Sequence, residues 1–147
     1  MTALPPRLTA VTLGVRDVAA SARFYEALGF KRKFRATGDE IAFLDAGGVV
    51  LALWDWEKLA NDAVVPAKPL PQTFRGATCA WNCTTSAEVD AVFAKAIAAG
   101  AGPLRRPERT DYGGYRGYFS DPDGHAWEVV QAPGFAFTDD GRLILPE

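Results

Sequence analysis

The sequence has very few of the side chains that usually hold metal ions or attack substrates. Among its 147 residues there is one histidine, His125, and there are two cysteines, Cys79 and Cys83. Two thiols without further cysteines or a nearby histidine make a poor zinc site, so we expect both to be free thiols that act as small apolar residues. The lone histidine has no evident serine or cysteine partner, and no nucleophilic triad is predicted.

Four other features are also missing. No apolar run approaches the roughly 18 residues that a membrane span needs, and the first residues lack the pattern of a signal peptide. A formal net charge of −2 argues against nucleic acid as the main partner. The glycine pairs Gly47-Gly48 and Gly113-Gly114 indicate turns, not a glycine loop that binds phosphate. We therefore predict a cytoplasmic protein that binds neither membranes nor nucleic acids.

The composition is that of a globular protein, with 48% hydrophobic and 23% charged residues. A chain of this length can bury roughly two-thirds of its unfolded surface in one domain. We expect a single domain over residues 1–147, built from two smaller modules.

The first half of the chain predicts a strand, a helix and three further strands. The first strand is expected over residues 8–15. Asp17 is a suitable N-cap for a helix over residues 18–28, where apolar side chains recur three and four positions apart. The later strands are expected at residues 30–36, 40–45 and 49–56.

The same order of elements then repeats. Residues 57–74 contain several prolines and little periodicity, which predicts a linker. A strand is expected over residues 77–84, followed by a helix to about residue 99 that Thr85 and Glu88 cap. A short strand and a hairpin over residues 118–130 complete the second half.

This repetition predicts an internal duplication. We place module 1 at about residues 8–56, the linker at 57–74 and module 2 at about 75–132. A tail at 133–147 carries a turn signal of its own at residues 139–142, which is typical of a short hairpin.

Three stretches resemble the glyoxalase, bleomycin-resistance and extradiol-dioxygenase superfamily, also called the vicinal oxygen chelate proteins. They are residues 11–29, the restart after the linker, and the hairpin, in which an Asp-Pro-Asp-Gly turn is followed by an aromatic residue and Glu128. The resemblance implies an α+β fold. In that fold two tandem βαβββ modules form a curved mixed sheet around a cleft, often in a homodimer.

In metal-dependent members of this family, four positions that face the cleft hold the ion. The resemblance places them at Ala10, Ala52, Thr78 and Glu128. One strong ligand cannot fix the geometry of a metal site, so we predict no metal and no other cofactor. His125 lies three residues before Glu128, which puts it on the opposite face of the strand, and we expect it to face water beside the turn.

The alternation of residues along the strands extends the predicted cleft lining. With the loop at residues 111–116, which could close over a ligand and supplies Tyr115 and Arg116, the candidate ligand-binding residues are Trp54, Asn82, Tyr115, Arg116, Thr78 and Thr12. Trp54 is equally suited to the core or to a dimer interface. Asn82 has the alternative of satisfying backbone groups, and Tyr115 and Arg116 that of lying on the surface of an edge strand.

Glu128 is the candidate catalytic residue, and two interpretations of it stay open. A carboxylate in an apolar strand is costly to desolvate unless it is paired, hydrated or protonated. It either forms a salt bridge with Arg116 at the floor of the cleft, or it acts as a general base or a ligand-binding carboxylate.

Together these features predict a metal-independent protein that holds a small aromatic or planar organic molecule in the cleft of a homodimer. Whether the protein is an enzyme stays open. One alternative is a glyoxalase-like lyase or isomerase, or a dioxygenase-related enzyme, with an atypical metal site. The other is a metal-free enzyme that uses Glu128 as its base.

Overall fold

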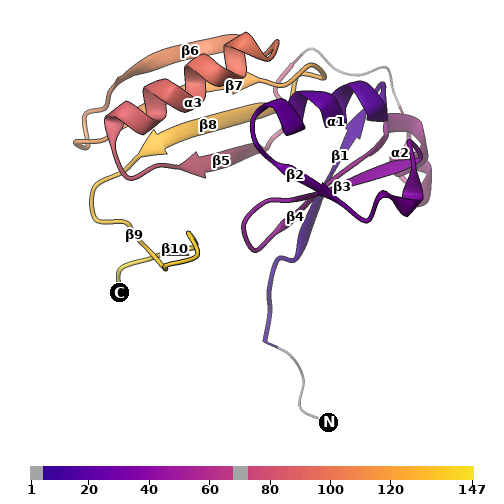
Figure 1. Cartoon of the computed structure of the whole chain (residues 1–147), viewed down its shortest axis with the longest axis horizontal. Helices are drawn as coiled ribbons and strands as arrows, with labels where there is room; N and C mark the ends of the chain where they lie inside the picture. The colour runs from indigo at the N-terminus through magenta and orange to yellow at the C-terminus, as the bar shows by residue number, and fades with distance from the viewer. Residues whose placement is uncertain (1–4, 68–72) are drawn as a thin grey trace.

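The computed structural model describes residues 5–67 and 73–147, which form two four-stranded sheets that lie side by side (Figure 1). In the first module, β1 runs parallel to β4, while β3 and β2 add antiparallel strands in the order β1-β4-β3-β2. Its elements are β1 (Ala10–Val15), α1 (Val18–Ala27), β2 (Lys31–Lys33), β3 (Ile41–Asp45) and β4 (Val50–Asp55).

The second module repeats this topology with the strand order β5-β8-β7-β6. Here β5 runs parallel to β8, and β7 and β6 follow as antiparallel strands. Its elements are β5 (Thr78–Asn82), α3 (Ser86–Ala98), β6 (Gly102–Arg109), β7 (Tyr115–Ser120) and β8 (Ala126–Gln131). The predicted α+β fold of two βαβββ modules is therefore confirmed, with the strands divided between two hydrogen-bonded sheets.

Side chains at the helix starts satisfy backbone N–H groups that have no partner within the helix. Asp17 Oδ1 accepts a hydrogen bond from the N–H of Ala20 at 2.9 Å, as its N-cap position predicts. Thr85 Oγ1 accepts from the N–H of Glu88 at 3.1 Å. The Glu88 carboxylate reaches one residue further back than a capping box requires and accepts from the N–H of Thr84 at 2.7 Å.

Three segments differ from their predicted structure. The first residues of the predicted linker form α2 (Trp56–Asp62), which Asp55 caps by accepting from the N–H of Lys58; residues 68–72 of the linker lie outside the described residues. The predicted strand over 30–36 stops at Lys33, because Phe34 has a φ of 50° and opens a 3-10 turn over Arg35–Thr37. The first strand after α3 extends further, to Arg109.

The tail forms the short hairpin that its turn signal predicts. The strands β9 (Ala136–Phe137) and β10 (Leu143–Ile144) pair with each other and with neither of the larger sheets. In Figure 1 this hairpin lies on the side of β5 and β8 away from α3. None of the described helices is long and apolar enough to cross a membrane.

A single hydrophobic core runs through both modules and lies between the sheets and their helices. Phe24 and Phe93 are buried on the inner faces of α1 and α3. Trp127 stacks on Phe119 with the two ring planes 1° apart. Both cysteines are free; Cys83 is buried and Cys79 half-buried. Burial raises the pKa of the Cys83 thiol to about 11, which keeps this thiol protonated.

The turn Asp121-Pro122-Asp123-Gly124 joins the two modules. The hydroxyl of Tyr25, on α1, donates to Asp121 Oδ2 at 2.6 Å and accepts from the indole N–H of Trp127 at 3.0 Å. Asp123 Oδ1 accepts from the N–H of Arg16 at 2.9 Å. The hairpin that carries the family resemblance is therefore a structural joint.

His125 belongs to the same joint, so the prediction that it faces water is wrong. Its Nε2 lies 2.7 Å from the carbonyl oxygen of Gly14 in β1. Its Nδ1 lies 3.3 Å from the guanidinium of Arg75. A carbonyl only accepts and a guanidinium only donates, so these contacts fit a neutral ring protonated at Nε2. The partners lie 111 and 50 residues away, which is why the local sequence gave no sign of them.

Candidate functional site

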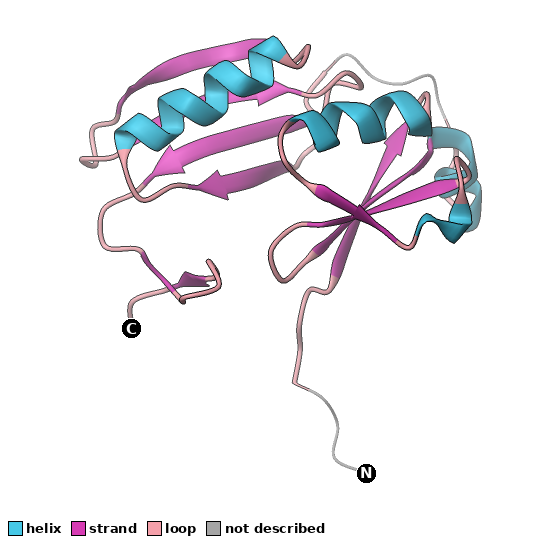
Figure 2. Cartoon of the chain, viewed as in Figure 1, coloured by secondary structure: helices cyan, strands magenta, loops and turns pink. Residues whose placement is uncertain are grey.

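Each large sheet has one face that packs against its helix and one that does not (Figure 2). On the second sheet, α3 covers the face that carries Phe119, Trp127 and Val129. The register of β5, β8 and β7 sets the residues of the opposite face in adjacent rows. We call this surface the Glu128 face; its rows are Thr78, Ala80 and Asn82, then Ala126, Glu128 and Val130, then Ser120, Tyr118 and Arg116.

Glu128 and Tyr118 form a pair at the centre of this face. They are directly opposed in the β7–β8 ladder, and the Tyr118 hydroxyl donates a very short hydrogen bond to Glu128 Oε2. This hydrogen bond, followed by burial and by the charge of Glu128, raises the pKa of Tyr118 to about 12. Within residues 5–67 and 73–147, Glu128 Oε1 accepts no hydrogen bond from another side chain. The pair therefore presents one acceptor to a bound molecule.

Arg116 does not form the predicted salt bridge with Glu128. Its guanidinium lies 3.4 Å from Glu108 Oε1, and Glu108 also pairs with Arg105. The register explains the difference, because Arg116 stands opposite Val130 on one side and Glu108 on the other. Tyr118 is the residue that sequence reasoning missed. Counting back from the Asp-Pro-Asp-Gly turn sets Ser120 opposite Ala126 and hence Tyr118 opposite Glu128.

Tyr115 lies on the helix-covered face of the same sheet, away from Glu128. Its hydroxyl donates to Asp90 Oδ1 of α3 at 2.7 Å, and the Arg109 guanidinium lies over its ring at 5.7 Å. Neighbouring residues in a strand point to opposite faces, so Tyr115 and Arg116 cannot line one site from the same strand.

Thr12 and Trp54 share a face of the first sheet, opposite the one that α1 covers. The helix α2 closes the end of this face, because Trp56 packs so closely on Gly14 that a Cβ there would stand 2.7 Å from Trp56 Cε3. Trp54 is half-buried, and its indole N–H has no hydrogen-bond partner among the described residues. This face therefore supplies an aromatic wall, but on a different sheet from Glu128.

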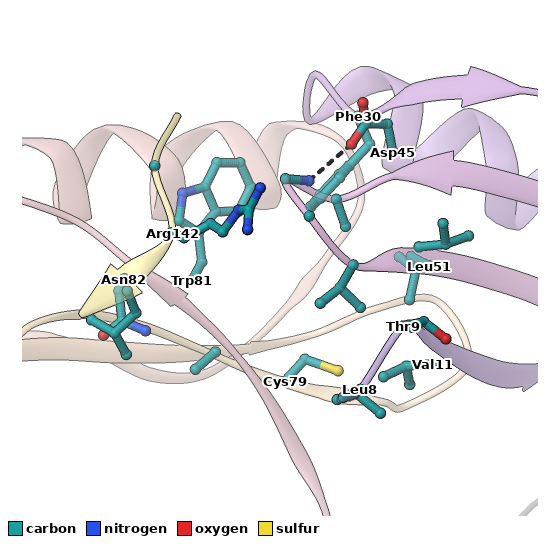
Figure 3. A pocket seen from close by; sticks show the side chains of 18 of the residues that line it. Leu8, Thr9, Val11, Phe30, Asp45, Leu51, Cys79, Trp81, Asn82 and Arg142 are labelled. Atoms are coloured by element: carbon teal, nitrogen blue, oxygen red, sulfur yellow. Dashed lines mark hydrogen bonds between the residues drawn. The ribbon is translucent and has the colours of Figure 1, made fainter. Parts of the chain in front are cut away.

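A groove of about 1380 Å³ runs between the two modules (Figure 3). Strands β1 and β5 border it with edges that no described strand pairs with. Of the predicted site residues, Thr78 and Asn82 line the groove, whereas Glu128, Arg116, Tyr115, Trp54 and Thr12 do not. The sequence did not predict the other residues that line the groove, among them Phe30, Trp81 and Arg142. These residues lie far apart in the chain, and no local sequence pattern shows that they come together.

The four positions that the family resemblance assigns to a metal do not supply a fitting set of donors. Ala10 and Ala52 lie on the first sheet, and Thr78 and Glu128 on the second. Across the described parts of the chain, no three His, Cys, Asp or Glu side chains are grouped to hold an ion. One carboxylate and one hydroxyl fall short of the ligand set that a divalent metal requires.

Comparison with known families agrees with this architecture. The sequence model of the Glyoxalase/Bleomycin resistance protein/Dioxygenase superfamily matches residues 7–129. The chain therefore belongs to this superfamily. A search of curated proteins gave no match.

Solved structures of the same fold include several close neighbours. A glyoxalase-related enzyme from Fulvimarina pelagi is 34% identical, with a TM-score of 0.85 over 96% of this chain and 99% of that one. A glyoxalase/bleomycin resistance protein/dioxygenase from Nocardioides is 27% identical, with a TM-score of 0.72 over 90% and 88% of the two chains. A lactoylglutathione lyase from Agrobacterium tumefaciens, at 22% identity, 87% and 95% coverage and a TM-score of 0.63, shares the fold.

Proposed function

We propose that this protein binds a small aromatic or planar organic molecule without a metal ion, and that it does so on the Glu128 face in a homodimer. The observation that carries the proposal is the Tyr118–Glu128 pair. It lies half-buried on a sheet face that no described helix covers, and no cationic side chain in the described parts of the chain pairs with its carboxylate.

The chemistry of the pair restricts the ligand. Tyr118 donates to Oε2, which leaves Oε1 as an acceptor, so the ligand must bring an N–H or O–H donor. Hydrogen bonds to a charged acceptor are stronger than neutral ones, and a partly desolvated site increases the difference. A planar molecule with an amine, amide or phenol group therefore fits better than an organic anion.

The residues around Glu128 leave room for such a molecule. Ala80 stands directly opposite it in β5, and Ala126 precedes it by two positions in β8. Thr78 and Asn82 border the same surface with short polar side chains. Small-molecule sites typically combine apolar surface with a few oriented polar groups, and this face has that character.

A second copy of the chain would complete the site. A flat sheet face buries only one side of a ligand, whereas Trp54 and Thr12 offer an aromatic wall and a hydroxyl on the first sheet. Placing the first sheet of one subunit over the Glu128 face of the other would enclose the ligand. Sedimentation at several concentrations tests this step: we expect about twice the chain mass of 15.8 kDa, and a monomer throughout would contradict it.

The binding proposal is tested with a panel of planar aromatic compounds, with and without N–H donors. We expect donors to quench Trp fluorescence and to raise the melting temperature, with unchanged affinity after treatment with a chelator. Glu128→Gln places an amide N–H where the acceptor was, so affinity should fall about tenfold. Glu57→Gln, on the exposed surface of α2, is the control. Equal losses in both variants, or no binding by any donor compound, would overturn the proposal.

A metal-free enzyme that uses Glu128 as a base is the second candidate. The hydrogen bond from Tyr118 supports it, because it holds Glu128 Oε2 and leaves Oε1 to accept a substrate proton. In that case Glu128→Gln abolishes turnover and Tyr118→Phe lowers it, while Glu57→Gln retains it. A Glu128→Gln variant with full activity toward a substrate of this protein would exclude the role.

A further inference from the structure

We propose that the groove between the modules is a second binding site, which takes an organic anion with an elongated apolar body. Glu128 does not line this groove. The groove favours an anionic ligand, whereas the Glu128 face disfavours one. Thr78, Ala80 and Asn82 border both surfaces, but Glu128 and Tyr118 belong to the Glu128 face alone, so variants of Glu128 separate the two proposals.

The walls of the groove are mostly apolar. Leu51 and Trp127 are buried beneath it, and Val11, Phe30 and Trp81 are partly buried against the core. Phe30 and Trp81 meet edge to face, with their ring centroids 5.3 Å apart. Leu8, from the segment before β1, is 67% exposed. Burying surface of this kind under a ligand is favourable because it removes apolar groups from water.

The charges around the groove are predominantly positive. Arg7, Lys31 and Arg142 line it, with Asp45 as the opposing carboxylate. Asp45 Oδ1 is already used, since it accepts from the N–H of Gly47 at 3.0 Å. Lys31 forms no ion pair or hydrogen bond with any residue of the described ranges. A ligand with an anionic head is thus favoured over a neutral or cationic one.

Arg142 reaches the groove from the tail hairpin. Its side chain packs against the turn between β3 and β4, where a Cβ on Gly48 would stand 3.4 Å from Arg142 Nε. It also pairs with Asp140 Oδ2 at 3.1 Å, but both partners are more than 60% exposed. A surface ion pair of this kind is weak, so the guanidinium remains able to hold an anionic head group. Figure 3 shows Arg142 and Trp81 toward the same end of the groove.

The size of the groove favours an elongated ligand. A volume of about 1380 Å³ exceeds the roughly 300–1,000 Å³ of ordinary ligand pockets. The cationic side chains come from β2, the tail and the segment before β1, while the apolar surface extends along β5 and includes Val11, Phe30 and Leu51 of the first module. A linear apolar chain with one carboxylate or phosphate at its end satisfies both features.

Titration calorimetry with dodecanoate and dodecyl phosphate, below their micelle concentrations, tests the site in the full-length protein. We expect saturable binding of at least one of them, and the preferred head group identifies the source of the anion. Dodecyltrimethylammonium has the same chain with the opposite charge and should bind at least tenfold more weakly. Equal binding of all three probes would overturn the proposal, because the groove would then select apolar surface alone.

Charge variants locate the head group. Lys31→Gln and Arg142→Gln should each weaken binding of the anion about tenfold, whereas Lys31→Arg should retain it. Lys33→Gln is the matched control, since Lys33 lies two residues along β2 and outside the groove. Glu128→Gln should leave anion binding unchanged, which separates failure here from failure of the proposed function. If Lys31→Gln changes the mass in solution but not the affinity for dodecanoate, the groove is a contact between copies and the proposal is wrong.

Discussion

Tyr118 and Glu128 show how one cross-strand pair controls the acid–base chemistry of a whole sheet face. A phenol that donates to a carboxylate loses this hydrogen bond when it ionises, and its negative charge is then repelled. Both effects favour the protonated phenol and raise the pKa of Tyr118. The same bond occupies Glu128 Oε2 and leaves Oε1 as the second acceptor of the carboxylate.

This coupling predicts a change in the alkaline titration of the four tyrosines. In the wild-type protein, absorbance near 295 nm should report one tyrosine that ionises at about pH 12, and Tyr118→Phe should remove it. Glu128→Gln should lower that pKa, because the charge that opposes ionisation is gone. Glu57→Gln should not change it. An unchanged curve in Glu128→Gln would show that the pair does not form in solution.

At position 14 a side chain is excluded by the space around Gly14 and not by its backbone conformation. A Cβ at this position would stand 2.7 Å from Trp56 Cε3 and 3.3 Å from Trp56 Cα. A backbone atom cannot move aside cheaply, so we expect Gly14→Ala to lower the free energy of unfolding by about 1–3 kcal/mol, as overpacking does. Urea denaturation measures this change.

Gly102→Ala is the matched control for that experiment. Its new Cβ would meet Ser120 Oγ, also at 2.7 Å. The serine hydroxyl can rotate away, so the cost should be less than about 1 kcal/mol. If the two variants are equally stable, the packing of Trp56 on β1 is looser than these distances imply.

At the scale of elements, the hairpin between β7 and β8 is fixed to α1 by a buried hydroxyl. Tyr25 is fully buried, and it both donates to Asp121 and accepts from Trp127. Tyr25→Phe should therefore lower the free energy of unfolding by about 1–3 kcal/mol, because it leaves a buried acceptor and a buried donor unsatisfied. Tyr115→Phe removes a hydrogen bond of similar length at the exposed end of α3 and should cost less. Equal losses would contradict the assignment of this hairpin as the joint between the modules.

The elements that sequence reasoning placed best are those with strong local signals. Asp17 and Thr85 cap α1 and α3 as predicted, and glycine follows the C-cap of both helices at Gly29 and Gly100, where φ is 105° and 108°. The helix α2 also had a local sequence signal, because Asp55 is a favourable N-cap residue. The prolines further along the segment led to the prediction of a linker instead. Local patterns therefore locate elements reliably and their boundaries less so.

The candidate site was harder to predict than the fold, and the register of the strands is the reason. The sequence suggested Arg116, from the adjoining strand, as a partner of Glu128, but alternation could not say that Tyr118 stands opposite Glu128 while Glu108 stands opposite Arg116. Two shifts of register between β6 and β7 decide the second pairing. Such irregularities have no signature in the spacing of residues.

At the scale of the whole molecule, the two modules are joined by contacts between residues far apart in sequence. Tyr25 and Asp121 lie 96 residues apart, and Gly14 and His125 lie 111 apart. The internal repeat predicts two similar modules, but it carries no information about the side chains that connect them. The groove arises from this connection, since its walls come from both modules and from the tail.

The tail hairpin should contribute to binding in the groove more than to folding. Its strands pair with each other, and Leu143, Ile144 and Leu145 are 40%, 45% and 66% exposed. None of residues 133–147 is fully buried, so their removal leaves the hydrophobic core intact, and we expect the free energy of unfolding in urea to change by less than about 1 kcal/mol.

Binding of dodecanoate to the truncated chain should fall at least as far as in Arg142→Gln, because the truncation removes Phe137 and Leu143 from the groove along with Arg142. Binding of a planar donor compound to the Glu128 face should persist, since none of that face comes from the tail. Calorimetry on the truncated and full-length proteins measures both effects. A truncated protein that unfolds several kcal/mol more easily would instead make the hairpin part of the folding core, and an undiminished affinity for dodecanoate would remove it from the groove site.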